Sequence, residues 1–81
     1  MITLSVTSRK KKGKAFEEAS DIKTFRSMEE ARRQIQSIVR EMKAAKRENR
    51  PPATKIDAVS YDTEGERSML IELGAFESVD Y

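Results

Sequence analysis

The feature that most constrains the fold is one amphipathic segment in the middle of the chain. Over residues 28–49 the apolar side chains recur every three or four positions, which is the period of a helix with one buried face. This stripe consists of Ala31, Ile35, Ile38, Val39, Met42 and Ala45. Ser27, three residues before Glu30, fits a capping box at the helix start. Pro51 and Pro52 lack the amide protons that would continue the helix, so the sequence predicts a helix over 28–49.

The hydrophobic period before this helix is two, which is typical of strands. Ile2, Leu4 and Val6 alternate with hydroxyl residues and predict a strand with one buried face. A second strand is predicted within 15–25, but the polar run at 17–21 leaves open whether that part is strand or loop.

After the prolines the sequence predicts a C-terminal β-hairpin over residues 54–73. Its turn would consist of Asp62, Thr63, Glu64 and Gly65, with the glycine in the left-handed conformation. In this interpretation Met69, Ile71 and Leu73 face the core. Leu70 then lies on the other face, as a candidate apolar centre of an interface.

Together these elements predict one α+β domain over residues 1–81. It would contain a four-stranded, mainly antiparallel sheet with one long helix packed on one face, in the order β-β-α-β-β. A chain of 81 residues buries only about 60 to 65% of its unfolded surface, so we expect one thin core and no deep substrate cavity. The uncovered face of the sheet should be rich in Thr and Ser, and the strand order stays open.

Charge is unevenly distributed along the chain. Residues 1–50 carry fourteen Lys and Arg and seven Asp and Glu, a balance of +7, whereas residues 51–81 carry two and seven, a balance of −5. Such a split indicates an electrostatic partner for the basic half, or an arrangement in which the two halves neutralise each other. The basic half includes residues 9–14, six residues with no apolar side chain, which predict an exposed basic loop turning at Gly13.

The candidate partner-binding residues come from this loop and from one flank of the helix. On that flank the cations at positions 40, 43 and 47 have no acid at a favourable helical spacing, so they are expected to be available to a partner. The full set is Arg9, Lys10, Lys11, Lys12, Lys14, Arg33, Arg40, Lys43 and Arg47.

Catalysis is not expected. The chain has no His and no Cys, which removes the commonest general base, metal ligand and reactive nucleophile. The best oxygen cluster for a divalent cation is Asp57, Asp62, Glu64 and Glu66, but carboxylates around a turn are more often solvated. We therefore expect no catalytic residues, no metal, no cofactor and no small-molecule substrate.

These observations favour a non-enzymatic binding module. The net charge of +2 is low for a dedicated nucleic-acid binder, which favours a protein partner or self-association through the charged helix face and a sheet edge. Sequence-tolerant nucleic-acid binding through the basic loop and helix is the alternative. In size, lack of Cys and His, and mixed charge, the chain is similar to small accessory proteins of bacteria and their phages, including inhibitors that cover a larger protein.

The expected location is cytoplasmic, without membrane contact. No long apolar run and no signal-peptide segment occur in the sequence, and there is no Cys for disulfides. The identity of the partner is left open.

Overall fold

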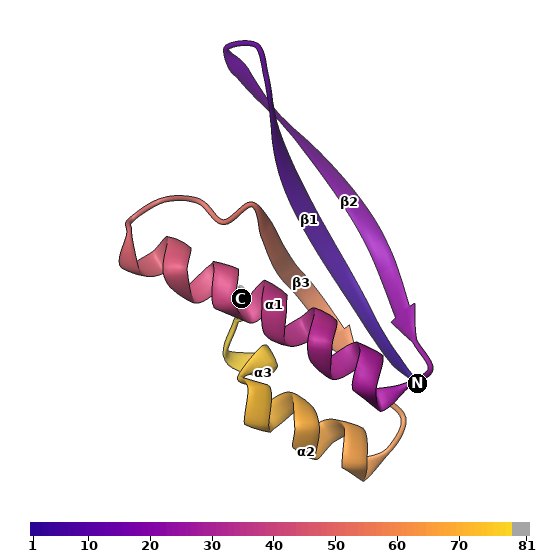
Figure 1. Cartoon of the computed structure of the whole chain (residues 1–81). Coiled ribbons are helices and arrows are strands. Elements are labelled where there is room, and N and C mark those ends of the chain that lie inside the picture. Colours follow the sequence, from indigo (N-terminus) through magenta and orange to yellow (C-terminus); the bar gives the residue numbers. More distant parts are fainter. Residues whose placement is uncertain (79–81) are drawn as a thin grey trace.

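Three antiparallel strands and two main helices form the part of the chain that the computed structural model describes, residues 1–78 (Figure 1). In chain order the elements are β1 (Ile2–Lys12), β2 (Ala15–Phe25), α1 (Met28–Arg47), β3 (Thr54–Ser60), α2 (Glu64–Leu73) and the short α3 (Ala75–Ser78). The strands lie in the order β2-β1-β3, with β1 in the centre. The predicted four-stranded β-β-α-β-β arrangement is therefore wrong, because the fourth strand is a helix.

The core lies between the sheet and α1. Ile2, Leu4 and Val6 alternate along β1 as predicted, are buried, and join the apolar stripe of α1 in one cluster. We call this side of the sheet the helix-covered face. The other side, the open face, carries the hydroxyl residues of β1 together with their partners on both flanking strands, such as Thr24 and Ser60, which confirms the expected Thr and Ser content.

Side-chain and backbone features of neighbouring residues determine where helix α1 begins and ends. Its N-cap is Ser27, whose hydroxyl accepts a hydrogen bond from the Glu30 amide at 3.4 Å, so the predicted start at residue 28 is confirmed. It ends at Arg47, two residues before the predicted end, and Asn49 then takes a positive φ of 54°. Beyond it, the Arg50 guanidinium donates to the carboxylates of Glu41 and Glu48 and fixes the chain as it turns toward β3.

The predicted C-terminal hairpin over 54–73 is wrong in its second half, which is helix α2. The Thr63 hydroxyl accepts from the Glu66 amide at 3.2 Å, and the Glu66 carboxylate accepts from the Thr63 amide at 3.0 Å, which completes a capping box. Gly65 lies in the first helical turn, and the left-handed glycine is Gly74, at φ 75°. Leu70 is fully buried in the core and so cannot centre an interface on the open face.

The predicted basic loop over 9–14 is also different in the structure. Arg9–Lys12 continue β1, and only Gly13 and Lys14 form the turn. The open question about 17–21 has a clear answer, because β2 runs without interruption from Ala15 to Phe25 and pairs with β1 along its whole length. The basic residues therefore lie on a long two-stranded ribbon instead of a loop.

Candidate functional site

The ribbon extends past the rest of the molecule. Strand β3 pairs with β1 only as far as Ser8, and the Arg9 amide donates to the Ala53 carbonyl at 2.8 Å, at the point where the third strand begins. Beyond this point β2 is the only strand within residues 1–78 that pairs with β1, and the side chains of Lys10, Lys11 and Lys12 are exposed. We call residues 9–20 the arm. Figure 1 shows it projecting away from the helices, and it accounts for a longest dimension of 44 Å against 24 and 22 Å in the other directions.

The tip of the arm is a two-residue turn that glycine makes possible. Gly13 has φ 65°, and Lys14 is not among the residues with positive φ, as in a type II′ turn with glycine at its first central position. Such turns match the twist of the flanking strands. The turn therefore keeps both strands paired to the end and presents Lys14 at the tip.

Cross-strand pairing divides the cations of the arm between its two faces. Lys10 and Lys12 lie opposite Glu17 and Ala15 on the side that continues the helix-covered face. Arg9 and Lys11 lie opposite Glu18 and Phe16 on the side that continues the open face. The arm thus carries five cations and two carboxylates, with positive charge on both faces.

Two of the five cations are engaged within the arm. Arg9 Nε lies 3.5 Å from Glu18 Oε1, and the Arg9 guanidinium lies 4.8 Å from the centre of the Phe16 ring, so this side chain is only 31% exposed. Lys12 Nζ is 3.9 Å from Glu17 Oε2, a distance typical of weak surface ion pairs. Within the described residues, Lys10, Lys11 and Lys14 form no ion pair. Arg9 therefore stabilises the arm, while the three lysines are available to a partner.

A second basic group lies on the outward surface of α1. Arg33, Arg40 and Arg47 are spaced by seven residues, so they form one row over four helical turns, and Lys43 lies beside them. All four side chains are exposed, and none forms an ion pair among the described residues. We call these four residues the α1 basic face. By strand alternation, Lys10 and Lys12 continue the face of the sheet that α1 covers, and the α1 basic face lies on the outer surface of that helix, so both groups belong to the same side of the sheet.

The acidic half of the chain does not neutralise the basic half. Among the side chains described, those of residues 1–76, one pair joins the two halves, between Arg32 Nη2 and Glu72 Oε2 at 3.3 Å. The Met1 amino group also contacts Asp62 and Glu66, but it belongs neither to the arm nor to the α1 basic face. Another pair, Arg67 with Glu64, stays within the acidic half. The positive charge of the arm and of the α1 basic face is therefore directed to solvent.

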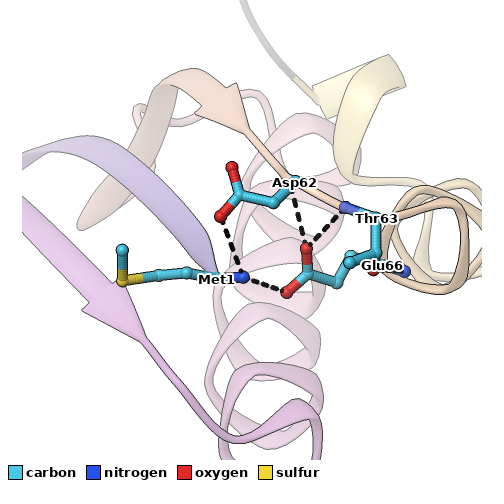
Figure 2. A network of polar contacts seen from close by, with 4 residues as sticks. All are labelled: Met1, Asp62, Thr63 and Glu66. Carbon is cyan, nitrogen blue, oxygen red and sulfur yellow. Dashed lines mark hydrogen bonds and ion pairs between the residues drawn. The ribbon is translucent and has the colours of Figure 1, made fainter.

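The carboxylates that the sequence suggested for a cation have structural partners (Figure 2). Glu66 Oε2 lies 2.6 Å from the amino group of Met1, and Asp62 Oδ2 lies 3.2 Å from the same group. The Glu66 carboxylate also accepts from the amides of Asp62 and Thr63, and Asp57 accepts from the Thr7 hydroxyl. The contact with the Met1 amino group is the largest cause that lowers the pKa of Glu66 from 4.5 to about 2, and the hydrogen bonds from the two amides add to it. The contact between Met1 and Glu66 also raises the pKa of the Met1 amine. Among the residues that the structure describes, no three His, Cys, Asp or Glu side chains are arranged to hold a metal ion.

Sequence reasoning proposed a sheet edge as a binding surface but did not locate it on β2. This strand is at the end of the sheet and is eleven residues long, and it carries Phe16 and Ile22, which are 61% and 69% exposed. The signal was present in the alternation of residues 15–25, but the run Glu17–Asp21 contains no large apolar residue and concealed it.

Comparisons of the chain with models of known families, with curated proteins and with solved structures give no match. None of the helices within residues 1–78 combines the length and the apolar character needed to cross a membrane. A functional assignment therefore depends on the geometry of the arm and of the α1 basic face.

Proposed function

We propose that this protein is a non-enzymatic module that binds nucleic acid with little sequence preference, using the arm and the α1 basic face. The observation that carries the proposal is the position of Lys10, Lys11 and Lys14 on a projecting ribbon, where they form no ion pair among the described residues. Lysine side chains are compact point charges that suit phosphate oxygens. A cytoplasmic location is part of the proposal, and the absence of cysteine is compatible with it.

The shape of the arm supports duplex DNA as the form of nucleic acid. A two-stranded ribbon is narrow enough to enter the major groove of B-DNA, which is about 12 Å wide, whereas the major groove of duplex RNA is too deep and narrow. Charge on both faces of the ribbon lets it approach the phosphates on both sides of a groove.

The composition of the arm supports weak sequence preference. Bidentate reading of bases uses mainly Arg, Asn and Gln, and the only such residue on the arm is Arg9. Its guanidinium is already held by Glu18 and Phe16. The remaining cations are lysines, which contact phosphates without specifying the sequence.

A protein partner is the second candidate. It is favoured by the exposed edge of β2, which offers unpaired backbone groups along eleven residues. Residues 15–20 of this edge belong to the arm, but residues 21–25 lie outside both the arm and the α1 basic face, so substitutions there separate the two kinds of binding.

The test is a fluorescence anisotropy titration of the full chain against labelled duplex DNA of two unrelated sequences, with unlabelled polyglutamate as competitor. We expect similar affinity for both duplexes and no displacement by polyglutamate at equal charge concentration, because the arm is shaped for a groove and not only for negative charge. Absence of binding at about 100 μM protein, the upper end of non-specific affinities, would overturn the proposal. Equal displacement by polyglutamate would favour an acidic protein partner instead.

A further inference from the structure

The edge of β2 is unusual for a sheet edge. Natural edge strands are usually short, or interrupted by Pro or a bulge, because an open edge invites pairing with another chain. Inward-pointing charges also protect edges, but those of β2, Asp21 and Lys23, have opposite signs and can pair with each other across two copies of the edge. Strand β2 has eleven residues, no Pro, and a continuous register with β1. Near its C-terminal end it exposes Ile22, which is 69% accessible although it lies in a regular strand.

One local contact identifies which backbone groups face outward. The Ile22 amide donates to the Asp21 side chain, with N to Oδ1 at 2.9 Å, and so it is not bonded to β1. Amide and carbonyl groups of alternate residues point to the same neighbour in an antiparallel ladder. The outward groups of β2 therefore belong to Ile22 and to the even-numbered residues before and after it.

We propose that a second copy of this chain pairs with this edge, β2 against β2, antiparallel and with a two-fold axis at Ile22. In this register Ile22 lies opposite Ile22 of the second copy on the open face, and Ser20 lies opposite Thr24 of the second copy. On the helix-covered face, Asp21 of each copy lies opposite Lys23 of the other, which makes two pairs of opposite charge. The amide of Ile22 then bonds to the second copy, and its bond to Asp21 is no longer needed.

Charge complementarity selects this register over its neighbours. An axis at Asp21 or at Lys23 places like charges opposite each other at the centre, and an axis at residue 19 places Asp21 opposite Glu17 twice. An axis at Ser20 pairs Glu17 with Lys23 but leaves Ile22 opposite Glu18. Only the axis at Ile22 both pairs the charges and covers the exposed isoleucine.

Apart from the local bond between the Ile22 amide and Asp21, the side chains that this pairing uses form no ion pair within the described part of one molecule. Across β1, Asp21 lies opposite Val6 and Lys23 lies opposite Leu4, and neither charged side chain forms an ion pair among the described residues. The product is a continuous six-stranded sheet in the order β3-β1-β2-β2-β1-β3. Because the axis is perpendicular to the sheet, both α1 helices lie on one side and the two arms point in opposite directions.

The test is sedimentation equilibrium of the full chain from about 10 to about 500 μM, the range suited to a small interface. We expect a reversible dimer. Lys23→Asp places Asp opposite Asp21 twice and should weaken dimerisation at least about tenfold, whereas the charge-swapped double variant Asp21→Lys, Lys23→Asp should return to within about threefold of the wild type. Circular dichroism of each variant checks that the fold is intact.

Cross-linking provides an independent readout of the register. The chain contains no Cys, so Ile22→Cys has a single thiol, and residues that pair across the axis are close enough for a disulfide. Under mild oxidation this variant should form a covalent dimer faster than Ala58→Cys, a matched control that is exposed on the open face of β3. A monomer at every concentration would overturn the proposal. So would failure of the charge swap to restore the dimer, or equal cross-linking of the two variants, even if nucleic-acid binding were found.

Discussion

Neutralising the arm should change how strongly DNA binding depends on salt. The variant is Lys10→Thr, Lys11→Thr, Lys12→Thr, in which threonine keeps a high preference for strands. Each lysine that neutralises a phosphate contributes about −0.9 to the slope of log affinity against log salt concentration on duplex DNA. The four arm lysines, including Lys14, then contribute about −3.6 to the slope, in addition to any contribution of the α1 basic face, and the triple variant should keep only about −0.9 of the arm contribution.

The magnitude is large enough to measure with confidence. Between about 50 and about 200 mM salt, the arm contribution of −3.6 lowers affinity by about 150-fold, whereas the −0.9 left in the triple variant lowers it by only about threefold. The measurement is fluorescence anisotropy with a labelled random duplex at four or more salt concentrations. The three lysines are exposed, so the substitutions should leave the thermal midpoint nearly unchanged.

A charge-matched variant separates position from net charge. Arg26→Gln, Lys55→Gln, Arg67→Gln removes three positive charges outside the arm and outside the α1 basic face. It should keep a slope close to that of the wild type. If both triple variants lose the same slope, binding reflects only the total charge, and the reasoning from the arm is refuted.

Three further predictions concern the fold. Leu70→Ala should lower the free energy of unfolding by about 2 to 5 kcal/mol in chemical denaturation, because this side chain is fully buried. Ile71→Ala should change it by less than about 1 kcal/mol, because that side chain is 53% exposed. The reverse order of the two effects would restore the strand interpretation. The pKa of Glu66 is lowered from 4.5 to about 2 in the fold, so the stability that its ionised form contributes is present above pH 4.5 and is lost as the pH falls toward 2. Glu66→Gln should flatten this part of the plot of unfolding free energy against pH. An unchanged plot would contradict the contacts of Glu66 with Met1, Asp62 and Thr63. Gly74→Ala forces a side chain into φ 75° and should cost about 1 kcal/mol in thermal denaturation, a loss that the same change at Gly65 should not produce.

Long periodic segments were predictable from the sequence because their apolar residues fit the period of a strand or the period of a helix, but not both. The alternation at Ile2, Leu4 and Val6 and the apolar stripe of α1 both extend over enough residues to define one period. The cap at Ser27 and the two prolines then placed the helix ends to within two residues.

The C-terminal part was predicted wrongly because its apolar run is short. Met69, Leu70 and Leu73 fit a helix, while Met69, Ile71 and Leu73 fit a strand, and the turn-forming residues before them favoured the hairpin. The decisive signal was the Thr63 to Glu66 spacing, the same capping pattern that had located α1. Tertiary packing of Leu70 against the core then determines the helical register.

The candidate site was predictable in its residues but not in its arrangement. Lysines at 10–12 have low preference for strands, so composition alone indicated a loop. In the structure, pairing with residues of β2 stabilises these lysines in a strand, with Lys10 opposite Glu17 and Lys11 opposite Phe16. Which lysines share a side with the α1 basic face depends on this register, which is a property of the whole sheet.

The most direct test of the central claim is an amide chemical-shift map of the ¹⁵N-labelled protein titrated with a random DNA duplex. The account predicts that the shifts concentrate in residues 9–20 and at the exposed positions of the α1 basic face, with α2 and the Met1–Glu66 network unperturbed. Shifts centred on α2 or on the Met1–Glu66 network, with the arm unchanged, would contradict it.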